Sequence, residues 1–147
     1  MKPYRAVYGA DNILQFGGEY ELNALDMSRE INQIGYDYSA IAFAEAQAIV
    51  DELNGNLVVV IIPSREEVYR DITEPIMGEE ALSRLESARI AMLSLCDELS
   101  LICFDAYETL STQANSGEAL YFSDDMHLNP YGNQVLAEAL ADWLELD

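Results

Sequence analysis

The chain has 147 residues, half of them hydrophobic, and its formal net charge is −20 from 27 acidic and 7 basic residues. This length suits one globular domain that buries about 70% of the surface of its unfolded chain. The charge argues against nucleic acid and anionic membrane surfaces as partners, because both attract clustered lysine and arginine. The sequence has neither the pattern of a signal peptide nor that of a membrane span, so we expect neither.

The N-terminal part of the chain predicts a hairpin and then an irregular connection. Two short apolar runs, 4–8 and 13–16, flank turn-forming residues at 9–12. Turn residues between β-prone runs favour a hairpin or two short extended pieces. Residues 19–37 are polar and lack periodicity, so we expect a long irregular connection there.

The next part predicts a helix and a buried strand. A helix is expected over 38–53, where Asn54-Gly55 provides a C-terminal stop. We expect its apolar stripe to face the core, and the stripe consists of Ile41, Ala42, Ala48, Ile49 and Leu53. Six consecutive aliphatic residues at 57–62 predict a strand covered on both faces, as in a parallel sheet. Ser64 and Glu67 then have the spacing of a capping box.

The second half of the chain repeats this alternation. We expect a helix over 79–99, a buried strand over 101–105, a short helix over 107–113 and a final helix over 130–146. Alternating helices and strands predict an α/β fold with parallel strands and right-handed crossovers. Two cysteines, at positions 96 and 103, are too few for a disulfide framework, and their apolar surroundings favour buried core thiols.

The segment from Asp124 to Gly132 is the most informative, because it contains the chain's single histidine. Asn129 is a good N-cap and Pro130 suits the first helical position, which places the histidine at a loop-to-helix junction. An imidazole beside a carboxylate is what a hydrolase requires of a general base and its orienting partner. The alternative is that the two aspartates only favour the helix N-terminus, and that His127 is an incidental surface residue.

Residues 120–133, LYFSDDMHLNPYGN, resemble the last block of the SGNH (GDSL-like) hydrolase superfamily, which supplies a catalytic Asp and His before the final helix. Residues 57–69 are similar to the strand and loop of a bacterial subset associated with acetylation or deacetylation of cell-surface polysaccharide. Residues 104–107 are similar to that subset's next strand. The resemblance implies a partial flavodoxin-like, three-layer α/β/α fold with a parallel sheet, in which the family's N-terminal strands are missing. It also implies a bacterial periplasmic or cell-surface location.

This resemblance implies one domain over 1–147, in which 37–147 is the SGNH-like C-terminal portion and 1–36 is an irregular or hairpin segment. His127 matches the family's base. Asp124 fits an Asp-x-x-His spacing and Asp125 an Asp-x-His spacing, so both remain candidates for its partner. The sequence contains neither the Gly-Asp-Ser block of the nucleophile nor the Gly-x-Asn-Asp block of the oxyanion hole.

The implied function is a portion of an SGNH-type ester hydrolase, or O-acyl or acetyl esterase, that uses an Asp–His pair on a small-molecule or carbohydrate ester. Without a nucleophile the isolated chain would be nearly inert, because the nucleophile contributes most of the rate. The alternative is a non-catalytic α/β binding or assembly module derived from such a hydrolase. We expect no metal ion and no cofactor.

Three other side chains receive structural interpretations. Ser64 is the best-placed serine, but capping already explains it. Arg65 could bind an anion near the sheet edge, although a solvated arginine is the preferred interpretation. Asp105, at a strand end, is expected in a turn or cap. Finally, the edge of the 57–62 strand would be long and apolar, so we expect a homo-oligomer or docking onto a complementing chain.

Overall fold

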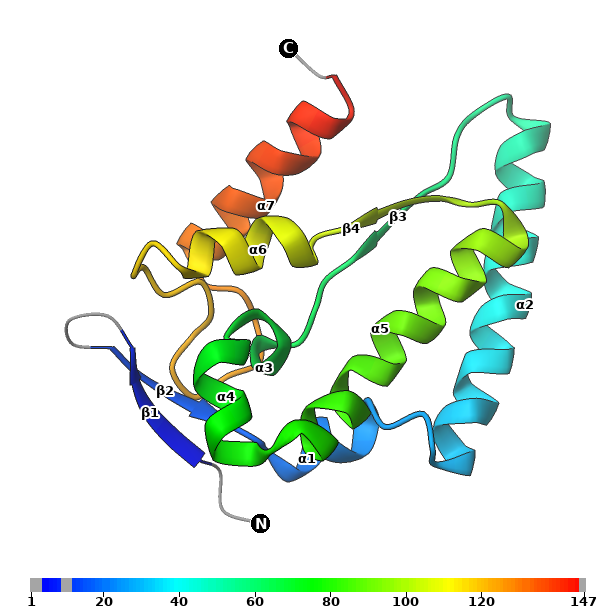
Figure 1. The fold of residues 1–147 in the computed structure, drawn as a ribbon. Helices are drawn as coiled ribbons and strands as arrows, with labels where there is room; N and C mark the ends of the chain where they lie inside the picture. Colours follow the sequence, from blue (N-terminus) through cyan, green and yellow to red (C-terminus); the bar gives the residue numbers. More distant parts are fainter. Residues whose placement is uncertain (1–3, 9–11, 146–147) are drawn as a thin grey trace.

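The computed structural model describes residues 4–8 and 12–145 of the chain (Figure 1). In chain order the elements are β1 (Tyr4–Tyr8), β2 (Asn12–Phe16), α1 (Glu19–Ala24), α2 (Glu30–Glu52), β3 (Val58–Ile61), α3 (Arg65–Val68), α4 (Arg70–Met77), α5 (Glu79–Leu99), β4 (Ile102–Asp105), α6 (Tyr107–Ala114) and α7 (Pro130–Trp143). None of the helices among these described residues is long and apolar enough to cross a membrane.

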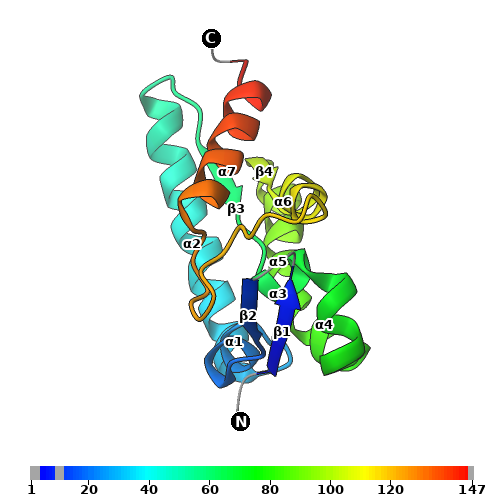
Figure 2. The ribbon, with the colours of Figure 1, turned by 90° about the vertical axis from the view of Figure 1, so that its left-hand side faces the viewer.

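The N-terminal segment forms the expected hairpin. Strands β1 and β2 pair antiparallel, with Tyr4 opposite Phe16, and they stand side by side in Figure 2. Of the expected turn at 9–12, residues 9–11 lie outside the described residues, and Asn12 is the first residue of β2. The expectation of an irregular connection over 19–37 is wrong, because this stretch contains α1 and the start of α2. Acidic residues in the first turns of both helices favour a helix N-terminus, so the polar composition there is compatible with helices.

The centre of the molecule is a small parallel sheet between helices, which confirms the α/β class. Strands β3 and β4 pair in parallel, with Val58 opposite Ile102. In Figure 1, α2 and α5 lie on one side of this sheet, and α6 and α7 lie on the other. Strand β4 contacts α7 through Phe104, whose ring centroid lies 5.3 Å from that of Trp143. In the described part of the chain, β3 pairs with β4 alone.

The two long helices use their apolar residues differently. On α5 an apolar stripe faces inward, and Leu82, Leu85 and Leu95 are almost fully buried. On α2 no residue is buried. The expectation that its stripe faces the core is wrong, because this face is exposed: Ile31 64%, Ile34 43%, Tyr38 71%, Ile41 57%, Ile49 60% and Leu53 75%. The 3.6-residue periodicity defines an apolar face, but it does not say what covers that face.

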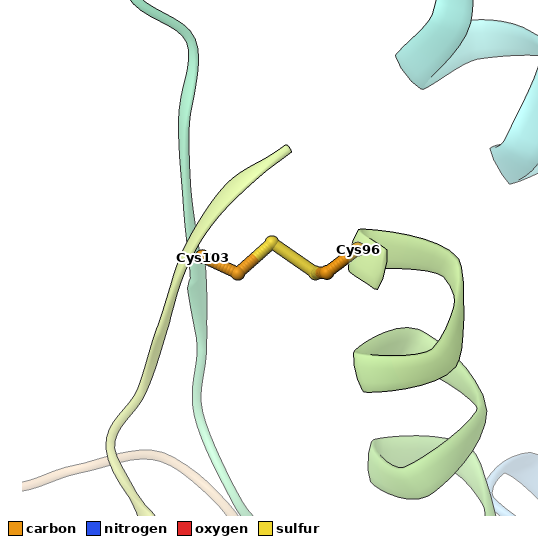
Figure 3. Close-up of a disulfide and its surroundings, with 2 residues drawn as sticks. All are labelled: Cys96 and Cys103. Carbon is orange, nitrogen blue, oxygen red and sulfur yellow. A yellow bond between two sulfur atoms is a disulfide. The ribbon is translucent and has the colours of Figure 1, made fainter. Parts of the chain in front are cut away.

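Cys96 and Cys103 form a disulfide, so the interpretation of two free core thiols is wrong (Figure 3). The bond joins the last turns of α5 to β4, and the two Cα atoms are 6.2 Å apart. Ser100 adopts a left-handed conformation with φ of 54°, and this turn directs β4 back along α5. Two cysteines seven positions apart thereby come within disulfide distance.

The main core joins the hairpin to the segment between α6 and α7. The ring centroids of Phe16 from β2 and Tyr69 are 5.9 Å apart, and those of Tyr69 and Tyr121 are 6.2 Å apart. Both pairs pack edge to face. The Tyr69 hydroxyl accepts a hydrogen bond from the Leu120 amide at 2.8 Å. The Tyr121 hydroxyl donates to the Pro63 carbonyl at 2.9 Å. These contacts fix the segment that carries the histidine against the carboxyl end of β3.

Candidate functional site

The segment 120–129 folds into a narrow loop that holds the predicted site residues at its tip. Tyr121 and Leu128 form an isolated antiparallel bridge. Inside this bridge, the Phe122 amide donates to the His127 carbonyl at 3.1 Å. Outside it, the Asn129 amide donates to the Leu120 carbonyl at 2.9 Å. The tip, residues 122–127, is therefore closed by main-chain bonds before the chain enters α7.

The start of α7 matches the sequence prediction. The Asn129 side chain accepts a hydrogen bond from the Gly132 amide at 2.9 Å, and Pro130 follows as the first helical residue. The Asn129 side chain also donates to the Ala119 carbonyl at 2.6 Å, which ties the two ends of the loop together. A Cβ on Gly132 would lie only 2.1 Å from the Leu120 carbonyl oxygen, so this position requires glycine.

His127 and Asp125 lie in contact at the loop tip. The imidazole Nδ1 is 2.5 Å from Asp125 Oδ1, and the same oxygen accepts the His127 amide at 3.1 Å. Hydrogen bonding from the His127 ring and amide holds the pKa of Asp125 below its usual range. Asp124 does not contact the ring, and instead its Oδ1 accepts from the Ser123 hydroxyl at 3.5 Å. Of the two aspartates left open by the sequence, the structure brings Asp125 to the imidazole.

A groove of about 320 Å³ lies next to this pair, at the carboxyl end of β3. Met126 and His127 line one side of it, and the end of β3 together with α1, α3 and α5 supplies the rest of the wall, including Leu85 and Met92. Open α/β sheets commonly bind ligands at the carboxyl ends of their strands. The His127 side chain remains 75% exposed and that of Asp125 52% exposed, so the pair is accessible from solvent.

Ser64 also lines this groove, but its hydroxyl is occupied by helix capping. Its Oγ accepts from the Glu67 amide at 3.3 Å and donates to Glu67 Oε2 at 2.9 Å. The Glu67 carboxylate in turn accepts the Ser64 amide at 2.8 Å, which completes the predicted capping box. The structure brings no histidine to this hydroxyl.

The environment of Arg65 was not predicted from the sequence. It is only 3% exposed, so the interpretation as a solvated arginine is wrong. Its Nη1 donates to the Phe122 carbonyl at 3.2 Å and to the Asp125 carbonyl at 2.8 Å. These partners are 57 and 60 positions away in sequence, and no local pattern predicts a contact over that distance.

A second arginine connects three elements beside the groove. Arg89 on α5 donates from Nε to Glu67 Oε1 at 2.6 Å and from Nη1 to Asp105 Oδ2 at 2.7 Å. Its guanidinium carbon lies 4.4 Å from the Tyr107 ring centre. Asp105 also accepts the Tyr107 amide at 3.1 Å, which agrees with the expected turn or cap role at the end of β4. Among the described residues, no group of three or more His, Cys, Asp or Glu side chains is arranged to hold a metal ion.

The chain matches a family of known proteins. The family model described as "SGNH hydrolase-like domain, acetyltransferase AlgX" matches residues 27–147. No curated protein and no solved structure matches the chain. Because the family match covers most of the chain and includes β3, β4 and the whole 120–129 loop, the chain belongs to this SGNH hydrolase-like family.

Proposed function

We propose that this chain supplies the Asp–His part of an SGNH-type site that hydrolyses or transfers an ester-linked acyl group. In this proposal His127 is the general base and Asp125 is the carboxylate that orients it. The observation that carries the proposal is the 2.5 Å contact between His127 Nδ1 and Asp125 Oδ1, at the rim of the groove beside β3. The serine nucleophile comes from a segment outside residues 1–147.

The chemistry follows from the free ring nitrogen. With Nδ1 held by Asp125, Nε2 of the neutral imidazole accepts the proton of the serine hydroxyl as its oxygen attacks the ester carbonyl carbon. The imidazolium then gives this proton to the departing alkoxide, which leaves an acyl-serine. Water or a second hydroxyl attacks that acyl group by the same route. Asp125 stays ionised throughout and stabilises the imidazolium.

We propose an acetyl ester of a carbohydrate as the substrate class. The family description names an acetyltransferase, which supports acetyl as the transferred group. The groove next to His127 is open to solvent and combines apolar walls with the charged side chains of Arg89 and Glu67. Such a site accepts a small acyl group beside a polar alcohol.

We further propose that the segment with the serine covers the exposed face of α2 and the free edge of β3. Five large hydrophobic side chains of α2 and that of Leu53 at its C-cap are exposed on one face, and β3 has one strand partner in the described chain. Every charged residue from 30 to 64 is acidic, so two copies of this face would repel each other. A complementing segment therefore fits this surface better than a second copy does.

Complementation tests both parts of the proposal. The chain is mixed with a polypeptide that carries the serine block of an SGNH family member, and hydrolysis of an acetyl ester is measured. We expect activity that is lost in His127→Ala, is reduced at least about tenfold in Asp125→Ala, and persists in the matched control Asp124→Ala. Activity in the His127→Ala mixture equal to that of wild type would reject the assignment.

Variants on the exposed face of α2 test whether the covering segment docks there. The double variant Ile34→Gln/Ile41→Gln should retain the melting temperature of the isolated chain, since both side chains are exposed. It should raise the concentration of the second polypeptide needed for half-maximal activity by about tenfold. Ile13→Gln is the control, because Ile13 is 54% exposed on β2 rather than on α2. Equal effects of both changes would argue against docking on α2.

A non-catalytic binding or assembly module is the second candidate. The sequence lacks Gly-Asp-Ser, and the exposed face of α2 is a feature of a binding protein as well. Carbohydrate or protein binding that is unchanged by His127→Ala, together with no activity in any complemented mixture, would favour this candidate.

A further inference from the structure

A buried guanidinium lies directly behind the exposed loop tip. Arg65 is 3% exposed, and its Nη1 atom donates to the carbonyls of Phe122 and Asp125 at 3.2 and 2.8 Å. These two carbonyls belong to opposite arms of the tip 122–127. One nitrogen therefore holds both arms of the tip against the N-terminus of α3.

Arg65 is itself fixed from the other side. Its Nη2 lies 3.8 Å from Glu66 Oε1, and that carboxylate oxygen accepts the Gly17 amide at 2.8 Å. Glu66 is 1% exposed, and burial raises its pKa. The guanidinium carbon also lies 5.5 Å from the Phe16 ring centre. The planar guanidinium is thus held between a buried carboxylate and an aromatic ring before it reaches the loop.

The Asp125–His127 contact needs such support, because it is exposed and spans only two residues. Exposed ion pairs contribute little on their own, since water competes and both side chains lose rotamer freedom. The distance from Nδ1 to Oδ1 depends on the main-chain conformation of residues 125–127. The hydrogen bond from Arg65 to the Asp125 carbonyl restrains the main chain at the start of that stretch.

We propose that Arg65 is a positioning residue for the Asp125–His127 pair, acting through the Phe122 and Asp125 carbonyls. Its hydrogen bonds go to these carbonyls rather than to the imidazole, and only 3% of its surface is exposed. A role of Arg65 in catalysis rests on the function proposed above, whereas its effect on the geometry of the Asp125–His127 pair is a property of this chain alone. Lysine is no substitute, because a single ammonium lacks the fixed fork that reaches two carbonyls and Glu66 together.

The single histidine allows a direct test on the isolated chain. A nitrogen–proton correlation spectrum of the imidazole, recorded near pH 9, reports which ring nitrogen carries the proton. Wild type should show mainly Nδ1–H, held by Asp125. Asp125→Ala defines the spectrum of an unpaired ring. Arg65→Lys should shift the ratio of the two ring tautomers to that of Asp125→Ala, with far-UV circular dichroism unchanged.

Arg84→Lys is the matched control and should retain the wild-type tautomer ratio, because Arg84 pairs with Glu80 on the exposed surface of α5. If Arg65→Lys does not fold, Arg65→Met/Glu66→Gln removes both buried charges and takes its place. A folded variant at position 65 that keeps the wild-type ratio would overturn the proposal.

This experiment separates the two proposals. If complementation yields no activity but Arg65→Lys still releases the ring from Asp125, the proposed function fails and the positioning role stands. If complementation yields activity, Arg65→Lys should lower kcat with KM little changed, since Arg65 is only 3% exposed.

Discussion

The disulfide between Cys96 and Cys103 makes a quantitative prediction about stability. The sequence separation is 7, so the closed loop holds eight residues. For that length the chain-entropy relation gives about 8 cal/mol/K, or about 2.5 kcal/mol at 25 °C, for the stabilisation that comes from constraining the unfolded chain. In a domain of this size that corresponds to a fall in Tm of about 5–10 °C when the bond is reduced.

The assay is thermal unfolding followed by far-UV circular dichroism, with and without a reductant, on protein purified under oxidising conditions. The double variant Cys96→Ala/Cys103→Ala should melt near the reduced wild type and should not respond to the reductant. Both cysteines are in the disulfide, so a thiol assay on oxidised protein should find no free thiol, and denaturation without reductant makes the buried Cys96 accessible to the assay. Two reactive thiols after denaturation without reductant, or a Tm change below about 2 °C on reduction, would refute the reasoning.

Three further predictions concern the loop and its helix. Gly132→Ala should lower the free energy of unfolding by about 1–3 kcal/mol in denaturant titrations, because the new methyl group would overlap the Leu120 carbonyl. Asn129→Ala should lower it by about 1 kcal/mol through loss of the cap, and Asn129→Ser should recover most of that loss. His127→Ala should raise the pKa of Asp125 toward its usual range through loss of the ring hydrogen bond, as followed by carboxyl-carbon NMR. Because the folded pKa of Asp125 is depressed, the pair's contribution to stability is present above the ordinary pKa of an aspartate and is lost as the pH falls through the lower folded pKa.

Local signals in the sequence predicted local structure well. The capping box at Ser64 and the N-cap at Asn129 both form as predicted, because each involves groups within three residues of one another. The parallel pairing of β3 with β4 and the inward stripe of α5 also follow the hydrophobic pattern. The same pattern failed for α2, since a stripe specifies a face and says nothing about whether this chain covers it.

Contacts between distant segments were not predictable from the pattern. Buried Arg65 donates hydrogen bonds to carbonyls 57 and 60 positions away. Both acceptors are main-chain groups, so the identity of the residue that carries each of them gives no signal in the sequence. The disulfide depends on the left-handed turn at Ser100, and a serine at this position does not predict a left-handed conformation. For the Asp–His pair, spacing left two aspartates open, and the fold of the loop tip brings Asp125 rather than Asp124 to the ring.

The family match begins at residue 27, yet the hairpin before it supports the loop that the match includes. The Gln15 amide donates to the Ser123 carbonyl at 2.8 Å, and Gly17 and Phe16 hold Glu66 and Arg65 in place. A shortened protein cut at the family boundary would keep every residue of the Asp–His pair and lose three of its distant supports. The structural unit that supports the loop is therefore longer at its N-terminus than the region that the family model matches.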